Sequence, residues 1–211
     1  HTHSVGIEVN NFGLPGTLDL PSGYSLNDGE LIVTQQVHSS LARTALSFQL
    51  LPNLGFVFRY SGHGNNGREA FDRINHDRSF DTHLTLSTEG KYLPGISIGL
   101  RDFIGTGWYS SEYIVGTKAY GDFGLTFGFG FGRLNGRNSF SNPLGELSSR
   151  FKNRVNKSYG RGGTFGSINW FQGDVSPFFS AKYRLNERIN LLAEYTPDQM
   201  SLESSYLDVR K

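Results

Sequence analysis

The chain has 211 residues and a mass of 23.5 kDa, and its 20 Lys and Arg residues nearly balance its 19 Asp and Glu residues, for a formal net charge of +1. This length suits one domain or two small ones, and the small net charge provides no positive field for nucleic acid. Without cysteine, the chain can form no disulfide, no thiol nucleophile and no cysteine zinc site.

The first element in chain order is an irregular N-terminal segment, residues 1–29. Glycine and proline recur within it, at Gly13, Pro15, Gly16, Pro21 and Gly23. These residues interrupt both helices and strands. We therefore predict a lead-in or plug that folds into the interior of the protein, and not a linker between domains.

From residue 30 to residue 211, the sequence predicts an all-β fold of antiparallel strands, about nine in number. Hydrophobicity with a period of two recurs in runs bounded by Gly, Pro, Asn and Asp. The runs span residues 30–38, 45–50, 54–60, 80–87, 96–101, 111–120, 123–131, 176–184 and 189–196. Many approach the 9 to 11 residues of a tilted strand that crosses a bilayer. This favours a transmembrane β-barrel, whole or as the N-terminal part of a larger one.

The alternation in residues 123–131 shows the two faces most clearly. Phe123, Leu125, Phe127, Phe129 and Phe131 share one face, and the other face carries Gly and Thr. A soluble sandwich would pack such a row into a dry core, whereas a membrane barrel would turn it towards lipid. The low charged fraction of 18% favours lipid, because a soluble sheet exposes a denser charge.

The connections alternate between short and long, as in outer-membrane barrels. Short turns are predicted at residues 52–53, 120–122 and 186–187. Long external loops are predicted at residues 62–78 and 134–174, and we interpret residues 163–172 as part of the second loop or a short plug.

The few long charged side chains on the polar face are candidates for lining a barrel lumen. The predicted lumen residues are Arg59, Arg101, Asp102, Glu112, Lys118, Lys182 and Arg184. Arg101 and Glu112 lie on consecutive strands joined by a Gly-rich turn, so we expect an ion pair across this hairpin. The pair would fill the interior or guide a sugar or an ion.

The second long loop carries a local excess of positive charge, a candidate surface patch for anionic polysaccharide or lipopolysaccharide phosphate. The patch consists of Arg137, Arg150, Lys152, Arg154, Lys157 and Arg161. Aromatic residues near strand ends are candidates for interfacial girdles; these are Tyr60, Trp108, Tyr109 and Tyr120.

The sequence gives little support for catalysis or for a cofactor. His76, Asp77, Asp81 and His83 form a His and Asp cluster, but their spacing matches no metal motif. The chain has no nucleophile-elbow pattern, and its alternating glycines open no helix that could cradle phosphate. We therefore predict a protein that is not an enzyme and has no cofactor and no metal.

Several segments resemble the YjbH-like family of outer-membrane proteins, and the resemblance covers nearly the whole chain. The segments are residues 12–22 (FGLPGTLDLPS), 28–31, 78–81, 92–94, 99–102, 105–107, 111–113 and 121–123. The resemblance implies a bacterial envelope β-barrel tied to the production and export of exopolysaccharide or capsule. Its implied location is the bacterial outer membrane.

Together, the pattern and the resemblance predict a passive outer-membrane barrel that exports or anchors an exopolysaccharide. Its expected partners are outer-membrane lipid and lipopolysaccharide, the polysaccharide and periplasmic envelope proteins, but not nucleic acid. One alternative is a structural or assembly component of the envelope that docks partners without conducting. A second is a soluble carbohydrate-binding β-sandwich.

Overall fold

The computed structural model describes residues 8–38, 41–63, 75–155, 164–165 and 169–199, and their regular structure is almost entirely β. The strands are β1 (Leu31–His38), β2 (Leu41–Leu51), β3 (Leu54–His63), β4 (Asn75–Ser87), β5 (Gly95–Gly105), β6 (Ser111–Tyr120), β7 (Phe123–Gly130), β8 (Thr164–Phe165), β9 (Ser176–Arg184) and β10 (Asn190–Tyr195). No helix in these ranges is long and apolar enough to cross a bilayer.

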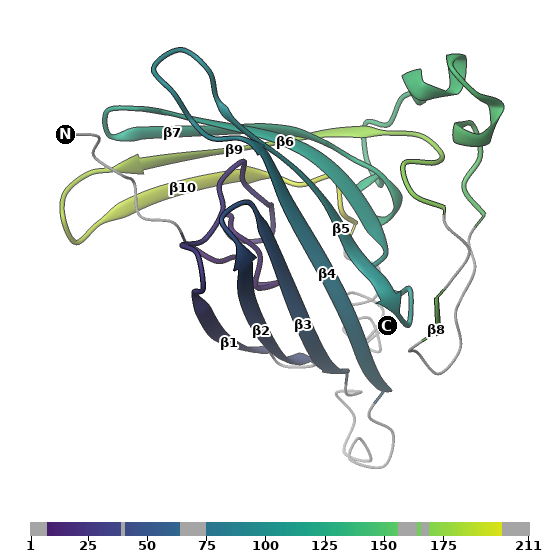
Figure 1. Cartoon of the computed structure of the whole chain (residues 1–211), viewed down its shortest axis with the longest axis horizontal. Helices are drawn as coiled ribbons and strands as arrows, with labels where there is room; N and C mark the ends of the chain where they lie inside the picture. The colour runs from purple at the N-terminus through teal and green to yellow at the C-terminus, as the bar shows by residue number, and fades with distance from the viewer. Residues whose placement is uncertain (1–7, 39–40, 64–74, 156–163, 166–168, 200–211) are drawn as a thin grey trace, which may run out of the picture.

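All strands belong to one antiparallel sheet that follows the chain order. The path runs from β1 through β7 to β9 and β10, and the two-residue strand β8 pairs with β5 beside this path. The nine predicted strands correspond to these nine elements of the path, so the all-β antiparallel prediction is confirmed. The sheet is strongly curved (Figure 1), but it is not closed, because β1 and β10 each pair with a single described strand.

The two faces of the sheet are inverted relative to a soluble protein. In β2 every second residue is buried, and the buried positions include Arg43, Ser47 and Gln49, whereas Leu46 and Phe48 are exposed. The same alternation in β3, β4, β7 and β9 leaves a polar inner face and an apolar outer face. An antiparallel sheet in water normally buries its apolar face and exposes its polar one.

The connection between β7 and β9 contains three short 3₁₀ helices. They are η2 (Gly132–Leu134), η3 (Pro143–Glu146) and η4 (Ser149–Phe151). A bridge between Phe140 and Val175 ties the loop to the start of β9. The other long loop, predicted at residues 62–78, begins later and ends earlier than expected, because β3 extends to His63 and β4 begins at Asn75. Its centre lies outside the described residues.

Residues 8–30, here called the strap, lie against the concave inner face of the sheet (Figure 1). Apart from two isolated bridges, at Val9 with Pro15 and at Gly16 with Pro21, the strap is irregular. Its buried Leu14 and Leu20 join a small apolar cluster with residues of the sheet. The other members of the cluster are Ala45, Val57, Tyr113, Val115, Leu134 and Phe178.

The strap is hydrogen-bonded to strands throughout the sheet. The backbone carbonyl of Gly13 accepts from Ser47 of β2 at 2.5 Å, and Gly23 N–H donates to Thr117 of β6 at 2.8 Å. At the far edge, the Glu194 carboxylate of β10 accepts hydrogen bonds from the Thr17 hydroxyl and from the backbone N–H groups of residues 18–20. The strap therefore connects strands near both edges of the sheet, from β2 to β10.

Close contact at Gly13 provides a test of how tightly the strap packs. Gly13 has a φ of +82°, and a Cβ there would lie 2.8 Å from the Ala45 Cβ and 2.9 Å from the Val57 Cγ1. Gly29 has a similar φ of +73° but open space around it. We expect Gly29→Ala to cost about 1 kcal/mol of unfolding free energy through backbone strain, and Gly13→Ala about 3 kcal/mol because overpacking is added. Denaturant titration of both variants measures the difference, and equal losses would contradict close packing at Gly13.

The connection between β4 and β5 gives the strap a pH-sensitive attachment. Glu89 accepts hydrogen bonds from Tyr24 at 2.5 Å and from Ala119 N–H at 3.0 Å, and its carboxylate lies 3.0 Å from the Lys118 ammonium. Burial alone would raise the pKa of Glu89, but these contacts outweigh it and hold the pKa below its ordinary value of 4.5.

Because the folded pKa is lowered, this stabilisation is complete above pH 4.5 and is lost as the pH falls through the folded pKa. We expect Glu89→Gln to lower the unfolding free energy by about 1 kcal/mol at neutral pH, and the difference from wild type to shrink in acid. Unfolding titrations between neutral and acidic pH measure this. Glu187→Gln, in an exposed turn, is the control, and a deficit of Glu89→Gln that persists unchanged in acid would refute the assignment.

Candidate functional site

The inner face carries a buried cluster of arginines packed around two aromatic rings. The guanidinium carbons of Arg43, Arg59 and Arg101 lie 4.3, 5.1 and 4.2 Å from the centre of the Phe12 ring of the strap. Tyr109 stands edge-on to Phe12 at 5.8 Å, and Arg133 lies 4.3 Å from the centre of its ring. The negative faces of aromatic rings attract such cations, more strongly where water is excluded.

Three buried aspartates lie beside these arginines. Asp81 forms an ion pair with Arg59, and both side chains are fully buried. The other Asp81 oxygen accepts the Asp102 N–H at 2.8 Å, and Asp102 in turn accepts the Tyr109 N–H at 3.0 Å. Asp77 accepts a hydrogen bond from the Thr106 hydroxyl. Three aspartates of β4 and β5 thus lie near three arginines of the sheet, and Arg59 with Asp81 forms the ion pair among them.

A β-bulge places two consecutive residues of β5 in this cluster. Phe80 pairs with Ile104 and Thr82 with Leu100, so Asp81 alone faces three residues of β5, including Arg101 and Asp102. Asp102 adopts a φ of +51°, a conformation that is uncommon outside glycine. The bulge turns both Arg101 and Asp102 inward, where regular alternation would place only one of them.

The structure places the predicted lumen residues in several different surroundings. The structure buries Arg59, Arg101, Asp102 and Lys182 on the inner side, where Lys182 lies 2.6 Å from Glu8 of the strap. Arg184 lies at the end of β9 and binds the exposed Asp122 at 2.7 Å.

Lys118 and Glu112 do not occupy the expected face. In β6 the inward positions are Tyr113, Val115 and Thr117, so Lys118 points outward. Glu112 pairs across the strands with Leu100 and so belongs to the outer side, but it is buried because the loop after β7 covers it.

The expected ion pair between Arg101 and Glu112 is wrong. Arg101 donates to the Asp19 carbonyl of the strap at 2.6 Å. Glu112 instead binds both terminal nitrogens of Arg154, at 2.6 and 3.0 Å. The physical reason is parity: the register places Glu112 opposite Leu100, which leaves Arg101 and Glu112 on opposite faces of the hairpin.

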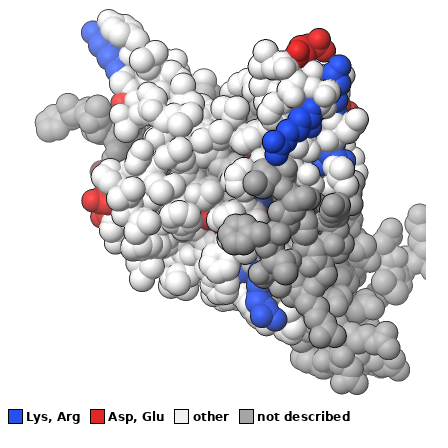
Figure 2. All heavy atoms as spheres, turned by 45° about the vertical axis from the view of Figure 1, so that its right-hand side comes forward, with Lys and Arg blue, Asp and Glu red and all other residues white. Residues whose placement is uncertain are grey.

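The predicted basic patch is smaller than expected. Arg137, Arg150 and Lys152 are exposed, Arg154 is engaged with Glu112, and Lys157 and Arg161 lie outside the described residues. Figure 2 shows most of the visible charged atoms at the borders of a broad face whose visible atoms are almost all uncharged.

Sequence reasoning missed several members of the cluster. The sequence patterns predict no site role for Arg43 or Phe12, and they predict Tyr109 in an outer girdle, whereas the structure buries it inside. The available signal was the alternation of residues 41–51, because Arg43 shares its face with Ala45 and Ser47. No local pattern indicates that Phe12 and Tyr109 meet.

The His and Asp cluster considered for metal binding is engaged in contacts within the protein. His83 contacts the Tyr113 hydroxyl and the Tyr24 carbonyl, both at 2.7 Å, and Asp81 binds Arg59. His76 lies on the outer side against Tyr60. Within the described ranges, no group of three or more His, Cys, Asp or Glu side chains is placed to hold a metal ion.

The buried ion pair predicts a large effect of neutralising one partner. We expect Asp81→Asn to lower the unfolding free energy by about 3 to 5 kcal/mol, because it leaves the buried Arg59 uncompensated. Asp122→Asn removes the partner of Arg184 at the exposed edge and is expected to cost less than about 1 kcal/mol. Denaturant titrations of both variants test this, and similar losses would argue against a buried cluster.

Comparisons with known proteins agree with the resemblance in sequence. The YjbH family model, described as "Exopolysaccharide biosynthesis protein YbjH", matches residues 8–209. "Uncharacterized lipoprotein YjbH" of Escherichia coli (strain K12) is 32% identical over 185 residues, which are 85% of this chain but only 26% of that protein. The chain thus spans about a quarter of the length of this curated relative. No solved structure gives a significant match. The family match covers the whole strap and every strand of the sheet, and the chain therefore belongs to the YjbH family.

Proposed function

We propose that this chain forms a β-barrel, or part of one, in the bacterial outer membrane, where it takes part in the export or anchoring of an exopolysaccharide. The observation that carries the proposal is the inverted sheet. Phe123, Leu125, Phe127 and Phe179 are each about half exposed on the outer side, whereas Arg59 and Asp81 are fully buried on the inner side. Lipid is the solvent that favours such an arrangement.

The dimensions of the strands support a membrane location. Most strands of the path have 8 to 13 residues, and a tilted strand needs about 9 to 11 to cross a bilayer. In a path of nine antiparallel strands, β1 and β10 point in the same direction. Bacterial single-chain barrels have an even number of strands, so our proposal makes these nine part of a larger barrel.

The link to polysaccharide rests on the family and on the exposed loop. The family description names exopolysaccharide biosynthesis, and the relative's name, lipoprotein, supports a location in the cell envelope. The loop after β7 presents Arg137, Arg150 and Lys152, which suit anionic polysaccharide or lipopolysaccharide phosphate. We propose a role without catalysis, in which the barrel provides a path or an anchor.

A second candidate function is a structural or assembly role in the envelope without conduction. The strap favours it, because residues 8–30 cover the inner face and contact strands from β2 to β10. Periplasmic envelope proteins would be the partners in this case. Planar-bilayer conductance of the purified protein distinguishes an open path from a filled one.

The proposal predicts that the protein is recovered in the outer-membrane fraction. It also predicts that the detergent-extracted protein migrates faster on a gel when it is not boiled than when it is boiled. Phe127→Arg in the middle of β7 places a charge in the apolar band and is expected to cost about 2 to 4 kcal/mol of membrane stability, so the heat-modifiable form should decrease. Leu147→Arg, at an exposed loop position, is the matched control and should behave as wild type.

Recovery of the wild-type protein in the aqueous fraction without a mobility shift would contradict the membrane proposal. That result would favour the soluble carbohydrate-binding alternative, although all described strands belong to one sheet and not to a sandwich of two. Equal membrane assembly of Phe127→Arg and Leu147→Arg would contradict the assignment of the outer face to lipid.

A further inference from the structure

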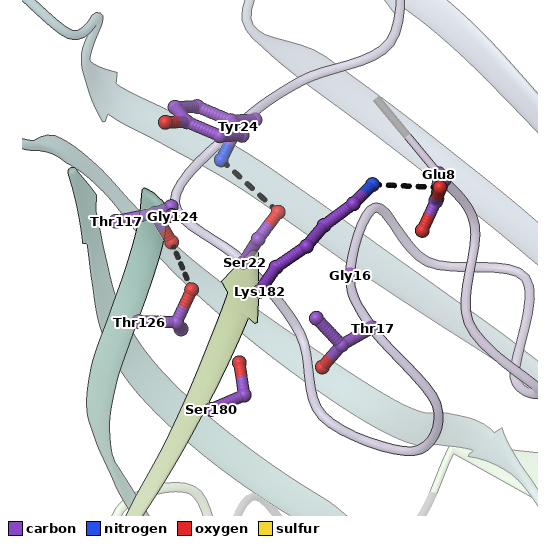
Figure 3. A pocket seen from close by; sticks show the side chains of 10 residues that line it. All are labelled: Glu8, Gly16, Thr17, Ser22, Tyr24, Thr117, Gly124, Thr126, Ser180 and Lys182. Atoms are coloured by element: carbon purple, nitrogen blue, oxygen red, sulfur yellow. Dashed lines mark hydrogen bonds and ion pairs between the residues drawn. The ribbon is translucent and has the colours of Figure 1, made fainter. Parts of the chain in front are cut away.

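A small pocket lies between the strap and the strands β6, β7 and β9, and most of the polar groups around it are hydroxyls (Figure 3). Its volume is about 40 Å³, which is room for water molecules. The hydroxyl-bearing residues of its wall are Thr17, Ser22, Tyr24, Thr117, Thr126 and Ser180. The pocket is separate from the arginine cluster, whose side chains are absent from its lining.

The strand register builds the floor of this pocket. Thr117 pairs with Thr126, and Thr126 pairs with Ser180, so three hydroxyls form one row across β6, β7 and β9. The Thr117 and Thr126 hydroxyl oxygens lie 2.8 Å apart. In the neighbouring row, Gly124 pairs with Lys182, and the missing side chain leaves the lysine stem open on that side. Hydroxyl rows of this kind can donate to and accept from the hydroxyls of a sugar.

Lys182 is the cation among the residues that line the pocket, and it is well buried. Its ammonium lies 2.6 Å from the Glu8 carboxylate, and Glu8 keeps 49% of its side chain exposed. The lysine needs an anion, because a buried unpaired charge is costly. The exposed glutamate is a weak occupant, because pairs with a solvated partner contribute little. Another carboxylate can therefore replace it.

We propose that this pocket binds the acidic sugar unit, a hexuronate, of a polysaccharide, and that Glu8 occupies the position of the sugar carboxylate when the site is empty. The sugar carboxylate takes the place of Glu8 on Lys182, and its ring takes the pocket together with the space of the displaced Glu8 side chain, because the pocket alone has room only for water molecules. The row from Thr117 to Ser180 faces its hydroxyls. The ring of Tyr24, held by its hydrogen bond to Glu89, flanks the site. This inference rests on the proposed polysaccharide role and names its substrate class.

The test is isothermal titration of the detergent-solubilised intact protein with oligogalacturonate, and with a neutral maltooligosaccharide of the same length as control. Glu8→Gln removes the competing carboxylate, so we expect its affinity for oligogalacturonate to rise about fivefold. Lys182→Met should lower the affinity at least tenfold. Arg184→Met is the matched control on the same strand, because Arg184 pairs at the exposed edge, and it should bind as wild type.

Three results would overturn the site: equal binding of the neutral and the acidic oligosaccharide, no gain in affinity for Glu8→Gln, or equal affinity of Lys182→Met and Arg184→Met. If Lys182→Met does not fold, Glu8→Gln decides the question alone. Gel mobility of the same samples separates the two proposals. A heat-modifiable protein that does not bind oligogalacturonate refutes only the site. A water-soluble protein that binds it refutes the membrane role and leaves the site standing.

Discussion

The structure depends on a partner for every charged side chain of the inner face, because these side chains are buried away from bulk water. A sheet that buries Arg43, Arg59, Arg101, Asp77 and Asp81 is stable only if each charge meets an opposite charge, a hydrogen bond or an aromatic face. The aspartates of β4 supply the first, and the strap supplies much of the rest. Phe12 lies between the guanidinium groups, and the strap carbonyl of Asp19 accepts from Arg101. The core of this protein is therefore ionic and aromatic, with only a small apolar cluster beside it.

The same requirement explains the irregular form of the strap. A regular strand would use its N–H and C=O groups within a ladder, whereas the strap leaves them available to the sheet. The N–H groups of residues 18–20 converge on Glu194, and the carbonyls of Gly13 and Tyr24 accept from Ser47 and contact His83. Segment 12–22, which carries the family resemblance most visibly at the N-terminus, is the part that makes most of these contacts.

The strap lies over the inner face, so a ligand that enters this face has to displace part of the strap. The strap contacts the arginine cluster through Phe12 and borders the hydroxyl-lined pocket through Glu8. The two contacts differ in strength, because Phe12 is buried while Glu8 is half exposed. A ligand at the pocket would displace the weaker contact and leave the stronger one in place. A path through the inner face, in contrast, would require movement of the whole strap.

The sequence by itself determined the nine strands, their short turns and the face of most residues, because side chains alternate with a period of two within each strand. It also assigned Arg59 and Lys182 to the polar face, which the structure buries. The tertiary structure decided where this period fails. The bulge opposite Asp81 turns Arg101 and Asp102 inward together, and the loop after β7 buries Glu112 against Arg154. It also decided the partners of the strap, since Thr17 and Glu194 are 177 residues apart in the chain. Periodicity is a local property, whereas bulges and long-range contacts follow from the packing of the whole sheet, and no single segment encodes them.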